Sequence, residues 1–426
     1  MDKMLLKRTA VQSVALMIAV ITISYALKQY SHTIISATDI KSAEAASLIP
    51  EEENITPTAD DIPDRASEEA GQQNGADAVK ESSGLPGMLK DVDTDIVKQL
   101  GDKYLVIRKP SVAGIKMDLQ DIYITKSINL IFSSTDAFQM NSDNIGRVNG
   151  KNVYIGNPSY SETNVLVTDP EDGTTTTVVT KDYGQDTVHG ISFTNPELSK
   201  NIIELTLELD TVYVHSIKED ETYYYISLKK PSEVYDRVLV LDAGHGGKDA
   251  GALSKDESVY EKNVNLGILL EVKKLLDKEN IKVYYTRLGD DKVFLRPRVE
   301  LANAVDCDYF ISIHSNASGS TKPSGTEIFY YATEFKQVSS KALATIFSEE
   351  IEKTTTLTNR GLVSLKKDDV YILNHSNVPA ILIESGYMTN LNDLNYLKEK
   401  ENQEAIAKGI YNGILRAYEE LPVKDK

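Results

Sequence analysis

In the C-terminal half of the chain, short runs of apolar residues alternate with longer segments in which apolar residues recur at helical spacing. The run at 238–241 is continuous and rich in valine and leucine, which is typical of a strand buried on both faces of a parallel sheet. Residues 261–276 carry apolar side chains at spacings of three and four, which predicts an amphipathic helix. This alternation predicts an α/β domain of three layers with a mostly parallel sheet over residues 237–421. The expected strands are 238–241, 281–286, 309–314, 325–331 and 380–384, and the expected helices are 261–276, 296–304, 339–353 and 403–418.

Residues 97–231 have a different pattern, in which short runs of β-branched and aromatic residues are separated by turn sequences. Asn149-Gly150 is a typical hairpin turn. We therefore expect a small all-β domain that resembles a sandwich. Its two histidines, His189 and His215, have no partner at ligand spacing, so we interpret them as structural or surface residues.

The first 37 residues have the pattern of a signal anchor. Three basic residues precede the mostly apolar run at 10–27, which as a helix would be about 27 Å long and so just able to cross a bilayer. The basic flank predicts that the N-terminus stays in the cytoplasm and that the rest of the chain lies outside. We expect an uncleaved transmembrane helix within residues 1–37; cleavage at the sequence 35–37 would instead give a secreted protein.

Residues 38–96 follow as an acidic segment that lacks aromatic side chains. Between residues 39 and 81, twelve acidic residues stand against three basic ones, so that this segment carries half of the net charge of the chain. Such a segment buries too little apolar surface to offset the entropy of ordering. We expect a disordered linker that holds the folded domains away from the membrane.

Charge and cysteine content exclude two classes of function. The formal net charge is −18, which argues against a nucleic-acid partner because phosphate contacts need clustered lysine and arginine. Cys307 is the single cysteine, so neither an internal disulfide framework nor a zinc site made of thiolates is available.

Candidate chemistry lies where the predicted strands end. His245, His314 and Glu384 each stand at the carboxyl end of a predicted strand, and Glu261 begins a predicted helix. In open α/β sheets, functional sites form outside the carboxyl ends of the strands. Two histidines and one glutamate with an open fourth position are typical of catalytic zinc, and the remaining glutamate is then the natural base. The glycines around His245 are compatible with a phosphate loop too, but no Gly-Lys-Ser/Thr sequence follows them.

Eight short stretches, spread in order over residues 237–421, are specific as a set although each alone is weak. They are L-D-A-G-H-G-G-K-D-A-G, Y-E-K-N-V-N-L, V-Y-Y-T-R, R-V-E-L-A-N, F-I-S-I-H-S-N-A, N-R-G-L, V-Y-I-L-N and I-L-I-E-S-G-Y-M-T-N. At these residues the chain resembles the zinc-dependent N-acetylmuramoyl-L-alanine amidases of peptidoglycan amidase family 3. The resemblance covers nearly half of the chain.

The resemblance implies a role for each candidate residue. His245, Glu261 and His314 would hold one zinc ion, and Glu384 would be the catalytic residue. Asn316 and Arg360, which lie in two of the matching stretches, are the candidate substrate contacts.

The implied function is that of a peptidoglycan hydrolase. It would cleave the amide bond between N-acetylmuramic acid and the L-alanine of the stem peptide with a zinc-activated water. It would act at the extracellular face of the membrane, on the side of the cell wall. The position of the β-rich domain resembles that of the wall-binding β domains which precede the amidase domain in some family members. Two alternatives are a zinc peptidase acting on stem peptides and a wall-binding protein with an inactive hydrolase domain.

The interval between His314 and Glu384 bears on regulation, because some similar amidases carry an inhibitory helix there. The predicted strand, the helix 339–353 and the loop 360–374 account for most of this interval, which leaves little chain for a plug. We therefore expect an open groove and no need for an activator. We interpret the glutamates at 349, 350 and 352 as part of a solvated helix face.

Overall fold

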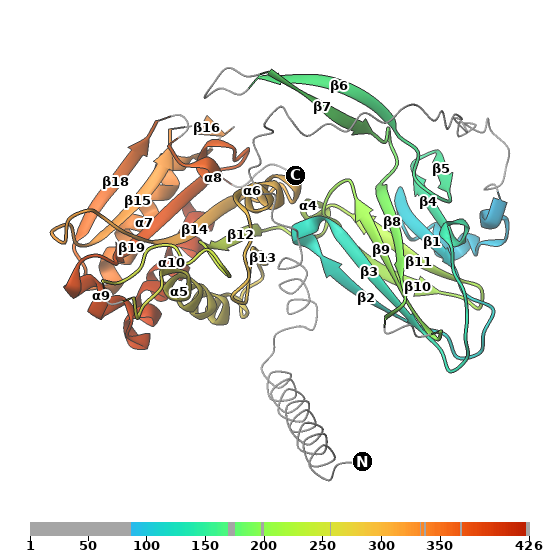
Figure 1. The fold of residues 1–426 in the computed structure, drawn as a ribbon, viewed down its shortest axis with the longest axis horizontal. Coiled ribbons are helices and arrows are strands. Elements are labelled where there is room, and N and C mark those ends of the chain that lie inside the picture. Colours follow the sequence, from blue (N-terminus) through green and yellow to red (C-terminus); the bar gives the residue numbers. More distant parts are fainter. Residues whose placement is uncertain are drawn as a thin grey trace, which may run out of the picture.

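The computed structural model describes residues 87–168, 175–196, 200–255, 257–332, 334–335, 338–366 and 369–422, which form a β-rich part and an α/β part (Figure 1). The predicted transmembrane segment and most of the predicted linker lie outside these residues. In the part of the chain that is described, no helix combines the length and the apolar character that a membrane crossing requires.

The β-rich part consists of two antiparallel sheets and one separate two-stranded ribbon (Figure 1). One sheet has the strand order β10-β11-β1-β4-β5, the other has the order β2-β3-β9-β8, and β6 and β7 form the ribbon. Side chains from both sheets, such as Leu105 and Phe132, share one buried cluster. The elements are η1 (Gly87–Asp91), α3 (Thr94–Val97), β1 (Lys103–Arg108), β2 (Lys116–Ile122), η2 (Tyr123–Thr125), β3 (Ser127–Ser133), η3 (Ser142–Asn144), β4 (Ile145–Asn149), β5 (Asn152–Ile155), β6 (Ser161–Thr168), β7 (Thr175–Asp182), β8 (Val188–Thr194), β9 (Ile202–Leu209), β10 (Val214–Glu219) and β11 (Tyr223–Lys229).

The N-terminal boundary of this part differs from the predicted one. We expected a disordered linker up to residue 96, but η1 lies within that range and α3 begins there. Met88 and Leu89 are buried in a cluster with Tyr104 and Tyr225 on the outer face of the first sheet. The pair Met-Leu supplies apolar surface that the acidic segment before it lacks, and burial of this surface stabilises the two short helices.

The α/β part is built on a six-stranded sheet with the order β13-β12-β14-β19-β15-β18. All neighbouring strands are parallel except β15 and β19, which are antiparallel. This confirms the predicted mostly parallel sheet. The elements are α4 (Pro231–Val234), β12 (Val238–Ala243), α5 (Glu261–Leu276), β13 (Lys282–Tyr285), α6 (Leu295–Ala304), β14 (Tyr309–Asn316), β15 (Thr326–Tyr331), β16 (Glu334–Phe335), β17 (Val338–Ser339), α7 (Ser340–Thr354), β18 (Asn359–Leu365), α8 (Tyr371–Asn374), β19 (Ala380–Tyr387), α9 (Leu391–Leu397) and α10 (Lys400–Glu420).

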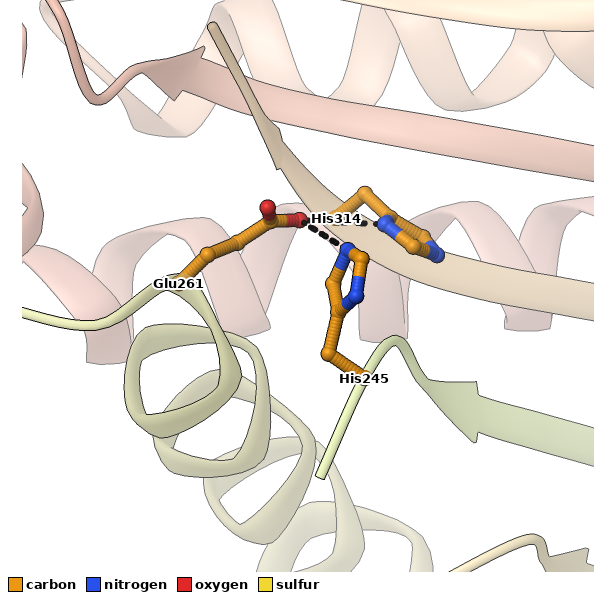
Figure 2. A group of neighbouring side chains, drawn as sticks. All are labelled: His245, Glu261 and His314. Atoms are coloured by element: carbon orange, nitrogen blue, oxygen red, sulfur yellow. Dashed lines mark hydrogen bonds and ion pairs between the residues drawn. The ribbon is translucent and has the colours of Figure 1, made fainter. Parts of the chain in front are cut away.

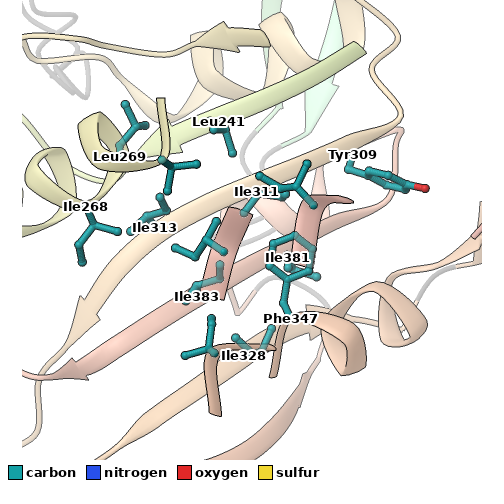
Figure 3. Close-up of a cluster of buried hydrophobic side chains, with 14 of the residues drawn as sticks. Leu241, Ile268, Leu269, Tyr309, Ile311, Ile313, Ile328, Phe347, Ile381 and Ile383 are labelled. Atoms are coloured by element: carbon teal, nitrogen blue, oxygen red, sulfur yellow. The ribbon is translucent and has the colours of Figure 1, made fainter. Parts of the chain in front are cut away.

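Helices pack on both faces of this sheet. On one face, residues of α5, α7 and α10 form a buried cluster with alternate strand residues, among them Leu241, Ile311 and Ile383 (Figure 3). On the other face, α6 and α8 pack against the remaining strand residues, including Val240 and Phe310. Because each strand residue points to the face opposite to its neighbour, a strand covered on both sides needs the continuous apolar run that the sequence has.

One strand of the six-stranded sheet was not predicted. Residues 360–374 were expected to be a loop, but β18 pairs in parallel with β15 at the edge of the sheet. The pairing contains an irregularity between Thr326 and Ile328 on the β15 side, opposite the segment that holds Arg360 and Gly361. An edge strand with an irregular register and a glycine lacks the long apolar run by which central strands are recognised.

The β-rich part packs directly against the α/β part. Tyr123 and Ile124 of η2 belong to the same buried cluster as Val240 and Tyr284. The hydroxyl of Tyr123 donates a hydrogen bond of 3.0 Å to the backbone carbonyl of Tyr285. Its ring meets that of Tyr284 edge to face, with the centroids 5.2 Å apart. The contact between the two parts is therefore a packed interface with an apolar core.

Candidate metal centre

Three chain segments meet at the carboxyl edge of the sheet. His245 follows β12 after one residue, His314 lies near the end of β14, and Glu261 is the first residue of α5. Since β12 and β14 are parallel neighbours, their ends lie at the same edge of the sheet. The predicted strand ends therefore come together as expected.

The three predicted ligands converge on one point. Nε2 of His245 lies 3.2 Å from Oε1 of Glu261, and Nδ1 of His314 lies 3.0 Å from the same oxygen (Figure 2). One ligand atom from each residue lies within 4.8 Å of the other two. Two imidazoles and one carboxylate are a donor set that suits zinc and leaves a coordination position open.

Glycines make room for this cluster. A side chain at Gly244 would bring its Cβ to 2.2 Å from the ring of His314. At Gly251, which has a positive φ of 66°, a Cβ would lie 2.6 Å from both Glu261 and His245. The glycines in this stretch therefore serve the close approach of the three ligands and exclude bulkier residues.

A fourth residue, Asp249, orients His245. Its Oδ2 lies 2.9 Å from Nδ1 of His245. A carboxylate on one ring nitrogen holds the proton there and leaves the other nitrogen, Nε2, for a metal. The sequence pattern did not indicate this residue, although it stands in the same glycine-rich stretch, four positions after the histidine.

The backbone of the metal loop is held by two buried arginines. His245 has a φ of +62°, a conformation that residues other than glycine rarely adopt. Arg298 donates to the carbonyl of His245 at 2.8 Å and to that of Ala243 at 2.7 Å. Arg287 donates to the carbonyls of Ala243 and Gly244 at 2.9 and 2.8 Å. These contacts fix three successive carbonyl groups and so stabilise the strained histidine.

Behind the loop, the carboxylate of Asp242 neutralises Arg298. Asp242 is fully buried and accepts hydrogen bonds from Arg298 and from the hydroxyls of Thr286 and Ser312. Burial would raise the pKa of Asp242, but Arg298 and the two hydroxyls outweigh it and hold the pKa below its ordinary value. No local pattern predicted a role for Arg287 or Arg298, although both stand in stretches that carry the resemblance.

Glu384 lies beside the cluster, in register with His314 on the neighbouring strand. It is buried, and its Oε2 has no hydrogen-bond partner among the residues that the structure describes. Burial raises the pKa of Glu384 well above its ordinary value, and the charges of Glu261 and Glu327 add to this shift. A buried carboxyl group without a structural partner is poised to exchange a proton with a bound water or substrate.

The metal ligands strongly shift one another's pKa values. Burial would lower the pKa of His245, but hydrogen bonds and charges from Glu261 and Asp249 outweigh it and raise the pKa to about 9. Burial would raise the pKa of Glu261, but hydrogen bonds from the two imidazoles hold it well below its ordinary range. A positive charge between the imidazoles and the carboxylate therefore suits the site, whether it is a proton or a metal ion.

The two candidate substrate contacts are joined by Glu327, which no local pattern had indicated. Nδ2 of Asn316 donates to Oε2 of Glu327 at 3.2 Å, and Nε of Arg360 donates to Oε1 at 2.7 Å. Glu327 lies on β15, directly opposite Glu384 in the register of the sheet. The structure therefore brings Asn316 and Arg360 to the same edge as the metal ligands.

The three glutamates of α7 lie in the interval where some similar amidases carry an inhibitory helix, but they do not belong to the metal site. Glu349 and Glu350 both accept from Arg416 on α10, and Glu352 accepts from Asn359. Glu350 is buried, which corrects the expectation of a solvated helix face, because Arg416 compensates its charge. None of the three is part of the metal-ligand group of the described residues.

Comparison with known proteins identifies the domain. The model of the family Amidase_3, N-acetylmuramoyl-L-alanine amidase, matches residues 239–416. The chain is 33% identical over 184 residues to the uncharacterised protein YqiI of Bacillus subtilis, which corresponds to 43% of this chain and 86% of YqiI. It is 34% identical over 188 residues to the amidase CwlM of Bacillus licheniformis, with 42% and 68% of the two chains covered. It is 35% identical over 184 residues to the probable cell wall amidase LytH of Staphylococcus saprophyticus, covering 43% of this chain but only 58% of LytH. The chain therefore belongs to the Amidase_3 family of N-acetylmuramoyl-L-alanine amidases.

Proposed function

We propose that the protein hydrolyses peptidoglycan at the amide bond between N-acetylmuramic acid and L-alanine, with one zinc ion held by His245, Glu261 and His314. The observation that supports this most directly is the juxtaposition of two features. Three residues of a zinc donor set have ligand atoms within 4.8 Å of one another, and the unpartnered carboxyl group of Glu384 lies on the adjacent strand.

When bound, zinc would lower the pKa of a water molecule and polarise the carbonyl of the scissile amide. Glu384 acts as the general base that accepts a proton from the attacking water. Because its pKa is raised, the same group then donates the proton to the departing amine of L-alanine. Asp249 keeps the Nδ1 proton of His245 in place and so preserves the orientation of the ring. No covalent intermediate with the protein is needed.

The metal centre alone does not separate an amidase from a peptidase that cuts within stem peptides. Analysis of the products released from purified cell wall separates the two activities. An amidase releases the free amino group of L-alanine and leaves the glycan chains intact, whereas a peptidase exposes other amino termini. The full-length, zinc-loaded protein is expected to give the first result, and Glu384→Gln protein is the control. New amino termini other than L-alanine would overturn the assignment.

We propose a location on the cell-wall side of the membrane, with residues 1–37 as the anchor. The basic flank and the apolar run of that segment support an anchor, and the family supports an extracytoplasmic place of action. We further propose that the β-rich domain, residues 97–231 together with the helices from Gly87, contributes to binding of the wall. Fractionation of cells, with and without residues 1–37, tests the anchor: loss of the segment should release the protein from the membrane.

We propose that no activator is required. The segment between β14 and β19 contains β15 and β18, which are strands of the sheet, and α7 and α8, which pack on the sheet. The three glutamates of α7 are engaged with Arg416 and Asn359. The full-length protein alone should therefore digest peptidoglycan; activity that appears only after a partner protein is added would contradict this.

A further inference from the structure

Four polar side chains stand in a row across four neighbouring strands, starting at the metal site. His314 on β14 pairs with Glu384 on β19, and Glu384 pairs with Glu327 on β15. On the edge strand β18, Arg360 completes the row through its hydrogen bond to Glu327. Neighbouring strands lie about 4.8 Å apart, so Arg360 lies roughly 10 Å from Glu384 across the sheet.

Glu327 holds neighbouring side chains of this row in place through hydrogen bonds. It is buried, and three donors from three strands use both of its oxygens. Arg360 donates to Oε1, while Asn316 and the hydroxyl of Tyr387 donate to Oε2, the latter at 2.8 Å. Burial raises the pKa of Tyr387 to about 12, and Glu327 adds to the shift, so the phenol stays a donor. With three of its roughly four acceptor sites used by protein donors, Glu327 holds its neighbours in place rather than a ligand.

Arg360 is held by Glu327 and also contacts the side chain of Tyr387. Nε is bound to Glu327, and the guanidinium carbon lies 5.6 Å from the centre of the Tyr387 ring. Its side chain is 38% exposed. The exposed part of the guanidinium, beyond its contacts with Glu327 and Tyr387, is available to a ligand. Two parallel N–H groups on a planar cation match a carboxylate, and a guanidinium that is already oriented loses little freedom when it binds.

We propose that Arg360 determines specificity by binding a free carboxylate of the stem peptide, and that Glu327 positions it. This inference rests on the proposed function, because it takes the scissile amide to lie between His314 and Glu384. An extended peptide spans about 3.3–3.6 Å per residue, so roughly 10 Å is reached within the first three residues after the cleaved bond. The ligand is therefore a carboxylate close to L-alanine, and an uncharged carboxamide in its place binds less well.

Two matched muropeptides test this. They differ only in whether the acidic residue next to L-alanine carries a free carboxylate or a carboxamide. The full-length, zinc-loaded protein should cleave the carboxylate form with a kcat/KM higher by about tenfold to a hundredfold, because a charge-assisted pair is lost in the other. Arg360→Gln should lower kcat/KM for the carboxylate form alone and bring the two values together.

Three further variants complete the experiment. Glu327→Gln should raise KM for the carboxylate form more than it lowers kcat, since it loosens the arginine without removing it. Arg360→Lys should reduce the preference, because lysine lacks both the fork and the Nε contact. Arg296→Gln is the matched control: this arginine is exposed on α6, paired with Glu300, and its loss should leave the preference unchanged.

The outcomes are distinguishable. If the wild-type protein cleaves neither muropeptide, the proposed function fails. If it cleaves both with equal kcat/KM, or if folded Arg360→Gln and Arg360→Lys proteins with normal zinc content keep the preference, the carboxylate site is wrong. Zinc content and circular dichroism are measured for each variant, so that a loss of metal or of fold is not taken for a loss of specificity.

Discussion

The carbonyl oxygen of His245 accepts a hydrogen bond of 2.8 Å from Nη2 of Arg298, a residue 53 positions further along the chain. Arg298 is almost fully buried. The histidine has a positive φ, so its backbone depends on surrounding contacts to keep its ring directed at Glu261. The metal site is therefore stabilised by a residue that touches none of its ligand atoms.

Arg298→Lys should weaken zinc binding by about tenfold to a hundredfold, the range typical of residues that support metal ligands. Lysine keeps the charge beside Asp242 but lacks the rigid planar fork with which Arg298 reaches the carbonyls of Ala243 and His245. Competition with a chromophoric chelator measures the affinity, and thermal unfolding of the metal-free protein shows whether the fold survives. Arg296→Lys, on the exposed side of the same helix, is the control. An unchanged zinc affinity in folded Arg298→Lys protein would refute the role of this arginine.

The roles of His314 and Glu384 can be separated by substitution. His314→Ala should lose zinc together with activity, because it removes one of three ligands. Glu384→Gln should keep zinc but lose activity by at least ~10²-fold, which is the usual contribution of general acid–base catalysis. Metal analysis and cleavage of a defined muropeptide give both readouts. A Glu384→Gln protein without zinc would instead make Glu384 a ligand.

Zinc binding should release protons. With its pKa raised to about 9, His245 is mostly protonated in the metal-free protein at about pH 7.5, and its imidazole must lose the proton to bind a metal. The apparent affinity for zinc should accordingly rise with pH until about pH 9 and level off above it. Calorimetry in buffers of different ionisation enthalpy should give about one released proton per zinc. A binding enthalpy that does not depend on the buffer would contradict this.

The interface between the two parts should contribute to stability. Tyr123→Ala removes a buried aromatic side chain and should lower the free energy of unfolding by about 3–5 kcal/mol, whereas Tyr123→Phe removes one hydrogen bond and should cost about 1 kcal/mol. Chemical denaturation of the full-length protein measures both. Tyr160→Ala, at an exposed tyrosine of the β-rich part, should have little effect. If Tyr123→Ala also leaves the free energy of unfolding unchanged, the contact of η2 with the α/β part does not contribute to stability.

Local patterns in the sequence determined the main elements and the candidate ligands. Apolar runs and helical spacing predicted the central strands and the long helices, although their ends differ by a few residues. The position of His245, His314 and Glu384 after apolar runs was sufficient to predict a shared site. The physical reason is that parallel strands have their carboxyl ends at one edge of the sheet, so strand-end residues meet whatever the details of packing.

Only the tertiary structure decided which residues support that site. The contacts of Arg298 with His245, and of Glu327 with Arg360, join residues that are 53 and 33 positions apart. They depend on the strand order and on the register of β15 with β18 and β19, which no local periodicity encodes. The same holds for β18 and for the packing of Met88, because an irregular edge strand and a short apolar pair become recognisable only when their partners in the fold are known.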